Sequence, residues 1–522
     1  MKIFSFAQHA LPSMHGYYEI VFLHGLQHRG AEIFYYACPG LEICDRARAP
    51  SYKPDCQYCI PVSLRVAAQG QIQLRKMDPF MRPQDDAIIL EWVKSLDPCQ
   101  YREAKFGAFE VGKWTFSSFN TSVNTPTYRH EDPTHKYVYM LFLAAGLRLC
   151  LYISRIIEQF TNEDRVLLYN GRMSISNIPR VLALKAGMTV YLHERAAYGQ
   201  RLMHKNGILY DVKRMLRQWR AWSNIPLTAL EIQQTKEYLI GRSRGDRTAL
   251  NWFAHAASQT NNLHEIIKKL HLSLDKKLWV LFTSSTDELE GQESYDKREF
   301  ASQHQWLMMV IKLMPNFPDT QLLIRIHPNI GNKHDDWERR FYKQFQKKQY
   351  PQVIVIDHDD PVSTYDLMAL ADAGLAYIST CSAEMAARAK PVLLGGASPY
   401  EGIEGIISGD TPEKLKSGLM ALYALPKGHE DLRLCRSAYR YFNWMINHRG
   451  KVISSVKPVS FDAVKLVYAS LDDFAPGKDP ALDYFCDAIF HGNDPAIYPS
   501  EGERLTSTDA EDDFFRNSSY RI

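Results

Sequence analysis

The sequence predicts an α/β protein of two domains, each with helices packed around a parallel sheet. At 522 residues the chain is too long for a single core. Short apolar runs alternate with helical patterns, as expected for buried parallel strands. One run, Gln321 to Asn329 (QLLIRIHPN), ends in His-Pro-Asn. Since ligands bind beyond the carboxyl ends of strands in open α/β sheets, we expect His327 at a binding edge.

Composition excludes several classes of protein. Hydrophobic residues at 45% and charged residues at 23% are globular values, and a net charge of +3 argues against bulk nucleic-acid binding. The apolar stretch Val138 to Ile153 contains Arg148 and predicts a buried core helix rather than a membrane span. No N-terminal signal is evident, so a cytoplasmic protein is expected. The basic stretch Lys213 to Trp222 is either a solvated helix face or a peripheral contact with the inner membrane face.

Four of the nine cysteines cluster near the start, as Cys38-x5-Cys44-x11-Cys56-x2-Cys59. Disulfides are not expected in a cytoplasmic chain. Four thiolates can complete a structural zinc site or hold an iron–sulfur cluster. The alternative is that these cysteines are small buried hydrophobic residues.

The first domain is expected over residues 1–270. A strand at Arg165 to Tyr169 is followed by Asn170-Gly171-Arg172, and a second strand ends in His193-Glu194-Arg195. With the helix between them these form a βαβ unit, which brings their carboxyl ends to one edge of the sheet. Asn-Gly is also an ordinary turn signal. We expect this edge to carry functional side chains.

The second domain is expected over residues 271–425. Thr283, Ser284 and Ser285 follow an apolar run, and hydroxyl and N–H groups there can bind phosphate or sugar oxygens. Ser379, Thr380 and Ser382 lie where a strand passes into a helix, whose N-terminus favours an anion. Glu384 either caps that helix or accepts sugar hydroxyls. Helices are expected over 426–470, and a poorly ordered tail over 471–522.

These motifs together resemble a known family. The matching elements, in order, are the run Thr283 to Glu288, RIHPN at Arg325 to Asn329, VSTYDLM at Val362 to Met368, ST-x-S-x-E-x-AA at Ser379 to Ala387, and KPV at Lys390 to Val392. They resemble bacterial capsular polysaccharide and lipopolysaccharide glycosyltransferases of the GT-B fold, the group that includes capsule β-Kdo transferases. The resemblance implies two facing Rossmann-like domains with a cleft between them, and catalysis without a required cofactor.

The resemblance also implies roles for the residues. The second domain would bind a CMP- or UDP-linked sugar through Arg325, Asn329, Glu384 and the hydroxyl-bearing residues named above. In the CMP-sugar branch, His327, Ser379 and Thr380 would contact the nucleotide phosphate. The first domain would bind a glycan or glycolipid acceptor, with Asn170, Arg172 and Arg195 on the acceptor side.

The expected reaction is transfer of a sugar from the nucleotide to the acceptor. His327 is expected to stabilise the leaving phosphate, and Glu194 or His193 to act as the base. Two alternatives stay open. One is a nucleotide-sugar 2-epimerase of the same architecture, and the other is a non-catalytic glycan-binding partner.

Overall fold

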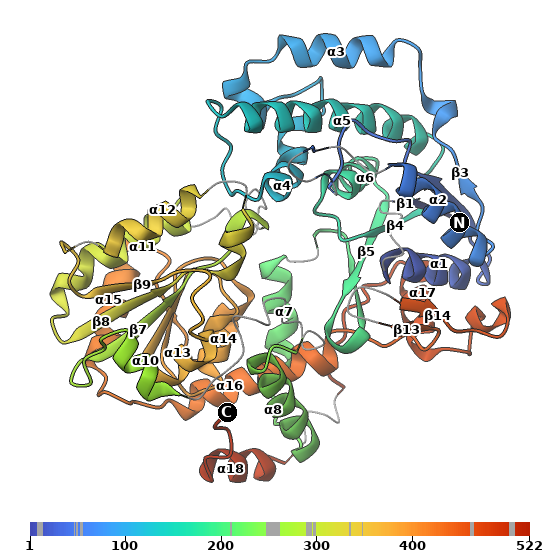
Figure 1. Cartoon of the computed structure of the whole chain (residues 1–522). Coiled ribbons are helices and arrows are strands. Elements are labelled where there is room, and N and C mark those ends of the chain that lie inside the picture. The colour runs from blue at the N-terminus through green and yellow to red at the C-terminus, as the bar shows by residue number, and fades with distance from the viewer. Residues whose placement is uncertain are drawn as a thin grey trace. The chain divides into compact units, whose positions relative to one another are not determined.

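The computed structural model describes residues 1–7, 14–45, 47, 51–52, 56–208, 211–246, 262–288, 295, 299–333, 336–346, 348–459, 464–500 and 507–522. The chain forms two compact units (Figure 1). The first combines Met1–Asp211, Asp287–Gly291 and Arg449–Ala496, and the second contains Val212–Thr286, Gln292–His448 and Ile497–Ile522. The predicted boundary at residue 270 therefore differs from the structure, because the helices after residue 211 pack with the second unit.

The first unit is built on a six-stranded sheet in the order β3-β2-β1-β4-β5-β6. The strands are β1 (Lys2–Ala7), β2 (Glu32–Ala37), β3 (Leu74–Arg75), β4 (Arg165–Tyr169), β5 (Thr189–Arg195) and β6 (Arg201–Lys205). Each neighbouring pair is parallel except β5 and β6, which are antiparallel. The first five strands have the order of a Rossmann fold, in which the chain reverses direction across the sheet between β1 and β4.

Apolar side chains from both faces of this sheet form separate cores. One core packs against helices α4 to α6 and the other against α1, α2 and α17 (Figure 1). The helices are α1 (Met14–Gln27), α2 (Cys56–Gln69), α3 (Asp85–Ser95), α4 (Val111–Val123), α5 (Pro133–Ile157), α6 (Ser174–Lys185) and α17 (Pro480–His491). Shorter elements are the 3₁₀ helices η1 (Asp78–Phe80), η2 (Pro98–Glu103), η3 (Ala197–Gly199) and η11 (Leu471–Phe474), and the hairpin of β13 (Val456–Pro458) and β14 (Val464–Leu466).

The predicted core helix is longer than expected. Over the described residues, α5 alone is long and apolar enough by length and composition to cross a membrane, and 61% of its apolar window is buried in the structure. Side chains such as Phe142, Leu143 and Ile153 are fully buried in the first unit. Arg148 lies at its surface, where it pairs with Glu42 at 2.5 Å. These contacts agree with a core helix.

The expectation of a poorly ordered tail over 471–522 is wrong for much of its length. Helix α17 packs against α1, and Phe485, Cys486 and Ile489 are buried between them. Arg29, in the turn after α1, donates to Asp483 and Asp487, each at 2.6 Å. Helix α18 (Asp509–Arg516) packs in the second unit, where Glu511 accepts from Arg440 at 2.7 Å. Apolar residues at helical spacing explain why these segments pack.

The second unit repeats the same strand order, but its sixth strand is parallel to its neighbour. Its six-stranded sheet has the order β12-β11-β10-β7-β8-β9, and every pair is parallel. The strands are β7 (Lys277–Phe282), β8 (Thr320–Arg325), β9 (Val353–Ile356), β10 (Ala373–Ala376), β11 (Val392–Leu394) and β12 (Ile407–Ser408). The chain reverses direction across this sheet between β7 and β10. The loops after these two strands therefore flank the position where a Rossmann-like sheet binds its ligand.

Helices cover both faces of the second sheet (Figure 1). Apolar residues of α11 and α15 pack on one face around Trp279 and Trp306, which are fully buried. The helices are α7 (Val212–Trp222), α8 (Ala229–Ser243), α10 (Leu263–Lys269), α11 (Gln303–Leu313), α12 (Trp337–Lys343), α13 (Thr364–Leu370), α14 (Cys381–Ala386), α15 (Pro412–Ala424) and α16 (Leu432–Asn443). Short helical turns are η5 (Thr286–Glu288), η6 (Met314–Asn316), η7 (Pro328–Asn332), η8 (Gln344–Gln346), η9 (Pro399–Gly402) and the π-helical η10 (Trp444–His448).

Candidate functional site

The candidate site lies at the carboxyl edge of the second sheet. Thr283 to Ser285 follow β7, His327 follows β8, and Ser379 to Ser382 follow β10. Because β8, β7 and β10 are adjacent and parallel, these three loops emerge side by side at the same edge. The sequence prediction that they share one edge is therefore confirmed. Their binding of a ligand stays a prediction.

A chain of hydrogen bonds joins the loops after β7 and β8. The Thr283 hydroxyl accepts from the His327 N–H at 2.8 Å, and Nδ1 of His327 accepts from the Asn329 N–H at 3.1 Å. The Asn329 amide then donates to the Ser285 hydroxyl at 2.9 Å. Since Nδ1 is an acceptor, a neutral His327 carries its proton on Nε2. The imidazole thus has a defined tautomer with an N–H donor at Nε2.

Ser284 is held by its backbone. Its N–H donates to the Gln303 side chain at 2.7 Å, and the same amide donates back to the Ser284 carbonyl at 3.1 Å. The Ser284 hydroxyl is buried and forms no hydrogen bond with any residue that the structure describes. An unpaired buried hydroxyl costs free energy, so this group can gain from a ligand oxygen.

A buried polar network that the sequence did not reveal lies behind this loop. Gln303 donates to the Tyr342 hydroxyl at 2.8 Å, and Glu338 lies 3.4 Å from His304 and forms an ion pair with Lys333. Burial alone would raise the pKa of Glu338, but the hydrogen bond to His304 and the charge of Lys333 outweigh it and hold the pKa at about 2. The network fixes the backbone of Ser284 through Gln303.

The turn after β10 is closed by its own hydroxyls. The Ser379 side chain accepts from the Cys381 N–H at 3.3 Å, and the Ser382 hydroxyl donates to the Ser379 carbonyl at 2.8 Å. Thr380 shares a 2.8 Å hydrogen bond with the Tyr400 hydroxyl. Helix α14 that follows has only six residues, so its dipole is weaker than the sequence suggested. These hydrogen bonds fix the turn, and its anion affinity stays a prediction.

Two residues predicted at the site make structural contacts. Oε1 of Glu384 accepts from Arg242 Nε and from the Tyr365 hydroxyl, each at 2.6 Å, so this carboxylate ties α14 to α8 and α13. Burial, together with the negative charge of Glu384, raises the pKa of Tyr365 well above its usual value. The buried Arg325 guanidinium donates to the Asp357 and Asp360 carbonyls. Their predicted roles in donor binding stay untested.

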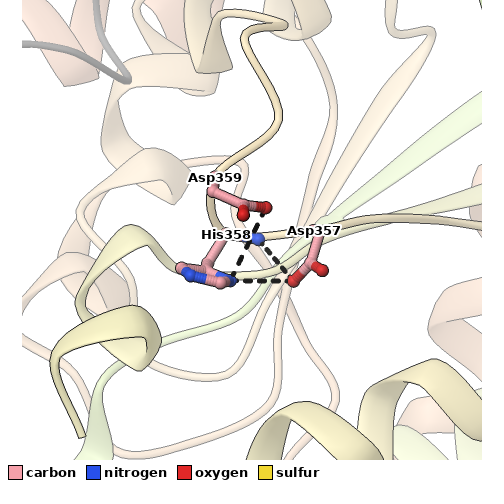
Figure 2. A group of neighbouring side chains, drawn as sticks. All are labelled: Asp357, His358 and Asp359. Atoms are coloured by element: carbon pink, nitrogen blue, oxygen red, sulfur yellow. Dashed lines mark hydrogen bonds and ion pairs between the residues drawn. The ribbon is translucent and has the colours of Figure 1, made fainter.

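Asp357, His358 and Asp359 come together at the end of β9 (Figure 2). His358 Nδ1 lies 2.8 Å from Asp357 and 3.9 Å from Asp359. However, Asp357 also pairs with Arg339 at 2.6 Å and Lys343 at 2.5 Å. Burial opposes ionisation, but these cations and His358 lower the pKa of Asp357. Two adjacent cations already neutralise the carboxylate, which disfavours a divalent metal there.

In the first unit, the predicted edge residues form a connected group. Asn170 and Gly171 both have positive φ, as an Asn-Gly turn requires. The Asn170 amide donates to Glu194 at 2.6 Å, and the second Glu194 oxygen accepts from the Arg195 N–H at 2.8 Å. Arg172 donates to the Ser117 hydroxyl at 3.0 Å. The turn and the carboxyl end of β5 are thus joined, as the βαβ interpretation predicted.

His193 lies on the other face of β5 from Glu194, because successive side chains of a strand alternate. It is fully buried, and its Nε2 lies 3.5 Å from Glu19 of α1. Burial raises the pKa of Glu19 to about 8, and burial with the charge of Arg201 lowers that of His193 well below its usual value. Glu19 is not among the residues predicted for the site, although a lone carboxylate within the apolar run YYEIVFL is a usable signal.

Helix α7 carries the predicted basic stretch. Its apolar face, including Trp219 and Trp222, is buried in the second unit, and Trp219 donates to the Gly402 carbonyl at 2.8 Å. Its exposed side chains are Lys213, Arg217 and Arg220. The apolar face is therefore engaged within the protein, and the exposed face is purely basic.

The fold and the site define an α/β protein with two Rossmann-like units, as in the GT-B fold, and a polar edge at the reversal point of the second sheet. This confirms the predicted fold class. Solved structures that match the chain include glycosyltransferases and epimerases.

Three of these matches are described here. KpsC β-Kdo 2,4-transferase of Thermosulfurimonas dismutans is 13% identical, over 60% of this chain and 87% of that chain, with a TM-score of 0.35. UDP-GlcNAc 2-epimerase of Neisseria meningitidis bound to UDP-GlcNAc is 10% identical, over 86% and 95%, with a TM-score of 0.25. The UDP-forming α,α-trehalose-phosphate synthase of Burkholderia vietnamiensis is 9% identical, over 63% and 79%, with a TM-score of 0.32. No family model and no curated protein matches the sequence.

Proposed function

We propose that the protein is a glycosyltransferase that moves a sugar from a nucleotide-activated donor to a surface glycan or glycolipid, in capsule or lipopolysaccharide synthesis. The observation that carries this proposal is the linked group of Thr283, Ser285, His327 and Asn329 at the reversal point of the second sheet. Such an edge is where Rossmann-like sheets bind nucleotides. The order of motifs that resembles capsular glycosyltransferases supports the same assignment.

The chemistry follows from the charge that develops as the donor breaks. When the sugar–oxygen bond of a nucleotide sugar is cleaved, negative charge grows on the leaving phosphate, and fixed donors aimed at it lower the barrier. His327 would supply its Nε2–H, and the buried Ser284 hydroxyl a second donor. Ser379 and Thr380 would contact the same phosphate. In this mechanism the protein's own donors take the role that a metal ion plays in other transferases.

The acceptor hydroxyl would lose its proton to a base in the first unit. Glu194 is the better candidate, because both its oxygens are positioned by Asn170 and the Arg195 N–H. His193 is fully buried on the face of β5 opposite to Glu194, which makes direct contact with an acceptor harder. Asn170, Arg172 and Arg195 would orient the acceptor. A cytoplasmic location with a peripheral membrane contact through the basic face of α7 would bring the enzyme to a lipid-linked acceptor.

Two substitutions of His327 separate its structural role, as an acceptor for the Asn329 N–H, from its proposed role as a donor to the phosphate. His327→Asn preserves an acceptor for the Asn329 N–H but removes the Nε2 donor, whereas His327→Ala removes both. We expect both variants to lose about 100-fold in transfer from the preferred CMP- or UDP-sugar, with the Asn variant keeping its melting temperature. His264→Ala, an exposed histidine of α10, is the control and should keep full activity. Wild-type turnover by His327→Asn would remove His327 from the mechanism.

Incubation with the donor alone distinguishes the alternatives. A transferase needs the acceptor for turnover beyond slow hydrolysis, whereas a 2-epimerase converts the free nucleotide sugar. Epimerised product would therefore overturn the proposal in favour of the epimerase. The absence of any thermal shift with CMP, UDP, GDP or their sugars would instead favour a non-catalytic glycan-binding partner.

A further inference from the structure

A buried arginine lies at the carboxyl edge of the first sheet, on the face that α1 covers. Arg201 opens β6 and pairs with Arg195, the last residue of β5. The residue is 1% exposed, and its guanidinium carbon lies 3.8 Å from the centroid of the Tyr18 ring of α1. The Tyr18 hydroxyl in turn donates to the Gly199 carbonyl at 3.0 Å. The guanidinium is therefore held in a fixed position against α1.

This cation has no counterion in the part of the chain that the structure describes. Its Nε is buried and forms no hydrogen bond there, and no described carboxylate forms an ion pair with it. Glu194 lies on the opposite face of the sheet. Burial raises the pKa of Glu19 to about 8, so this nearby carboxyl is neutral at pH 7. A buried charge without a partner is strongly destabilising, whereas an apolar side chain would fill the same space without this cost. The retained charge therefore indicates that Arg201 serves a ligand.

The fork of the Arg201 guanidinium points toward His15 in the first turn of α1. Nη1 and Nη2 lie 3.3 and 3.4 Å from one atom, His15 Nδ1, which is longer than usual for a charged donor. Two donors thus share one neutral acceptor. A carboxylate or a phosphate presents two oxygens at the spacing of this fork and would accept a short hydrogen bond from each nitrogen. The fork therefore has the geometry of an anion site that holds a weaker acceptor.

His15 joins the buried guanidinium to the partly exposed end of β4. The rings of His15 and Tyr169 lie with their centroids 3.7 Å apart, and both residues are half-buried. Tyr169 is the last residue of β4, so the pair lies where the chain reverses direction across the sheet between β1 and β4. Rossmann-like sheets bind their ligands at this point. A ligand that displaces His15 from the fork thus reaches Arg201 from the binding edge.

We propose that Arg201 and His15 form a binding site for an anionic group of the acceptor, a carboxylate or a phosphate. The anion takes the place of His15 Nδ1 on the guanidinium fork. The first turn of α1, a helix of 14 residues, adds the positive end of its dipole. Glu194, the proposed base, lies at the same edge, so an acceptor anchored by its charge can present a hydroxyl there. This inference rests on the proposed function, since it names the chemical class of the acceptor.

Sugars that differ mainly in charge test the site on the full-length wild-type protein without nucleotide, so the outcome is separate from that of the transfer assay. Glucuronate or glucose 6-phosphate should bind in calorimetric titrations at constant ionic strength, whereas glucose should not. Binding of only one charged sugar would support the site and identify the anion as a carboxylate or a phosphate. Hydrogen exchange should slow at residues 15–19 and 201–203 when that sugar is bound. No binding of either charged sugar, or protection confined to the second unit, would overturn the proposal.

Arg201→Met distinguishes a ligand-binding role from a structural one. It removes the charge but keeps an unbranched side chain, so the affinity for the charged sugar should fall by about tenfold or more. Without ligand, its melting temperature should equal or exceed that of wild type, because an uncompensated buried charge has been removed. Arg65→Met, at an exposed arginine of α2, is the control and should keep the wild-type affinity. Wild-type affinity in Arg201→Met, or a melting temperature well below that of wild type, would contradict the assignment.

Discussion

At the scale of single residues, the buried pair of Glu19 and His193 is the least expected feature of the first unit. Glu19 accepts from the Tyr35 hydroxyl at 3.2 Å, and its other oxygen lies near His193. Both groups are neutral in the fold at pH 7, because burial raises the pKa of Glu19 to about 8 and lowers that of His193. The positive charge of Arg201, which is also buried, partly offsets this rise in the pKa of Glu19.

This pair predicts a pH dependence of stability. The folded state holds the Glu19 proton up to about pH 8, whereas the unfolded chain releases it near pH 4.5. The stabilising contribution is therefore complete below pH 4.5 and declines as the pH rises to about 8, by at most about 5 kcal/mol. The lowered pKa of His193 has the opposite effect on stability. Below about pH 6.5 the unfolded chain gains a proton at His193 that the folded state does not, so stability falls as the pH falls.

Glu19→Gln isolates the carboxyl contribution. The difference in unfolding free energy, wild type minus variant, should fall steadily between pH 5 and pH 8 in urea denaturation. The His193 contribution is common to both proteins and largely cancels. Glu32→Gln, an exposed carboxyl at the start of β2, is the matched control. Parallel stability curves for wild type and Glu19→Gln would contradict this assignment.

The sequence predicted some site residues better than others, for a physical reason. Thr283, Ser285, His327 and Asn329 follow adjacent parallel strands directly, so the order of the strands brings them together. Glu384 also follows a strand of this parallel sheet. Its hydrogen-bond partner Arg242, however, lies on a helix that is distant in the sequence. Contacts set by the packing of remote helices have no local pattern in a sequence.

At the scale of elements, α17 shows how average composition can mislead. The last segment of the chain is rich in Asp, Pro and Ser, which favoured a poorly ordered tail. Within it, Leu482, Phe485, Cys486 and Ile489 recur at the spacing of one helix face, and all are buried. The Tyr191 hydroxyl of β5 donates to the Ala488 carbonyl at 3.0 Å, so the helix also bonds to the sheet.

Helix α17 should therefore be required for the stability of the first unit. Phe485, which is 1% exposed and lies edge-on to Phe22 with ring centroids 5.8 Å apart, loses its packing in Phe485→Ala. We expect a loss of about 3–5 kcal/mol in unfolding free energy. Tyr498→Ala, at a tyrosine that is 54% exposed, should change stability by less than about 0.5 kcal/mol. Equal stability of the two variants would restore the interpretation as a disordered tail.

At the scale of the whole molecule, both units use the same strand order around separate cores. Alternating apolar runs and helical patterns predicted this class of fold. The domain boundaries were harder to predict, because the first unit takes up Arg449–Ala496 after the chain has completed the second sheet. A segment that returns in this way is held by tertiary contacts, such as the 2.8 Å backbone hydrogen bonds between Arg201 and Lys451.

Because each unit has its own core, we expect a bound nucleotide to stabilise only the unit that binds it. At 100 times its dissociation constant, a ligand that binds only the folded state stabilises that state by about 2.7 kcal/mol. Because the proposed phosphate contacts lie in the second unit, hydrogen exchange should slow at Thr283–Ser285, His327–Asn329 and Ser379–Ser382 when CMP or UDP is added. Exchange in the first unit, including Asn170 to Arg172, should remain unchanged until an acceptor is present. The His327→Asn variant should lose the protection after β8. If the nucleotide instead slowed hydrogen exchange mainly in the first unit, the first sheet would be the nucleotide-binding one. The proposed donor and acceptor roles of the two units would then be reversed.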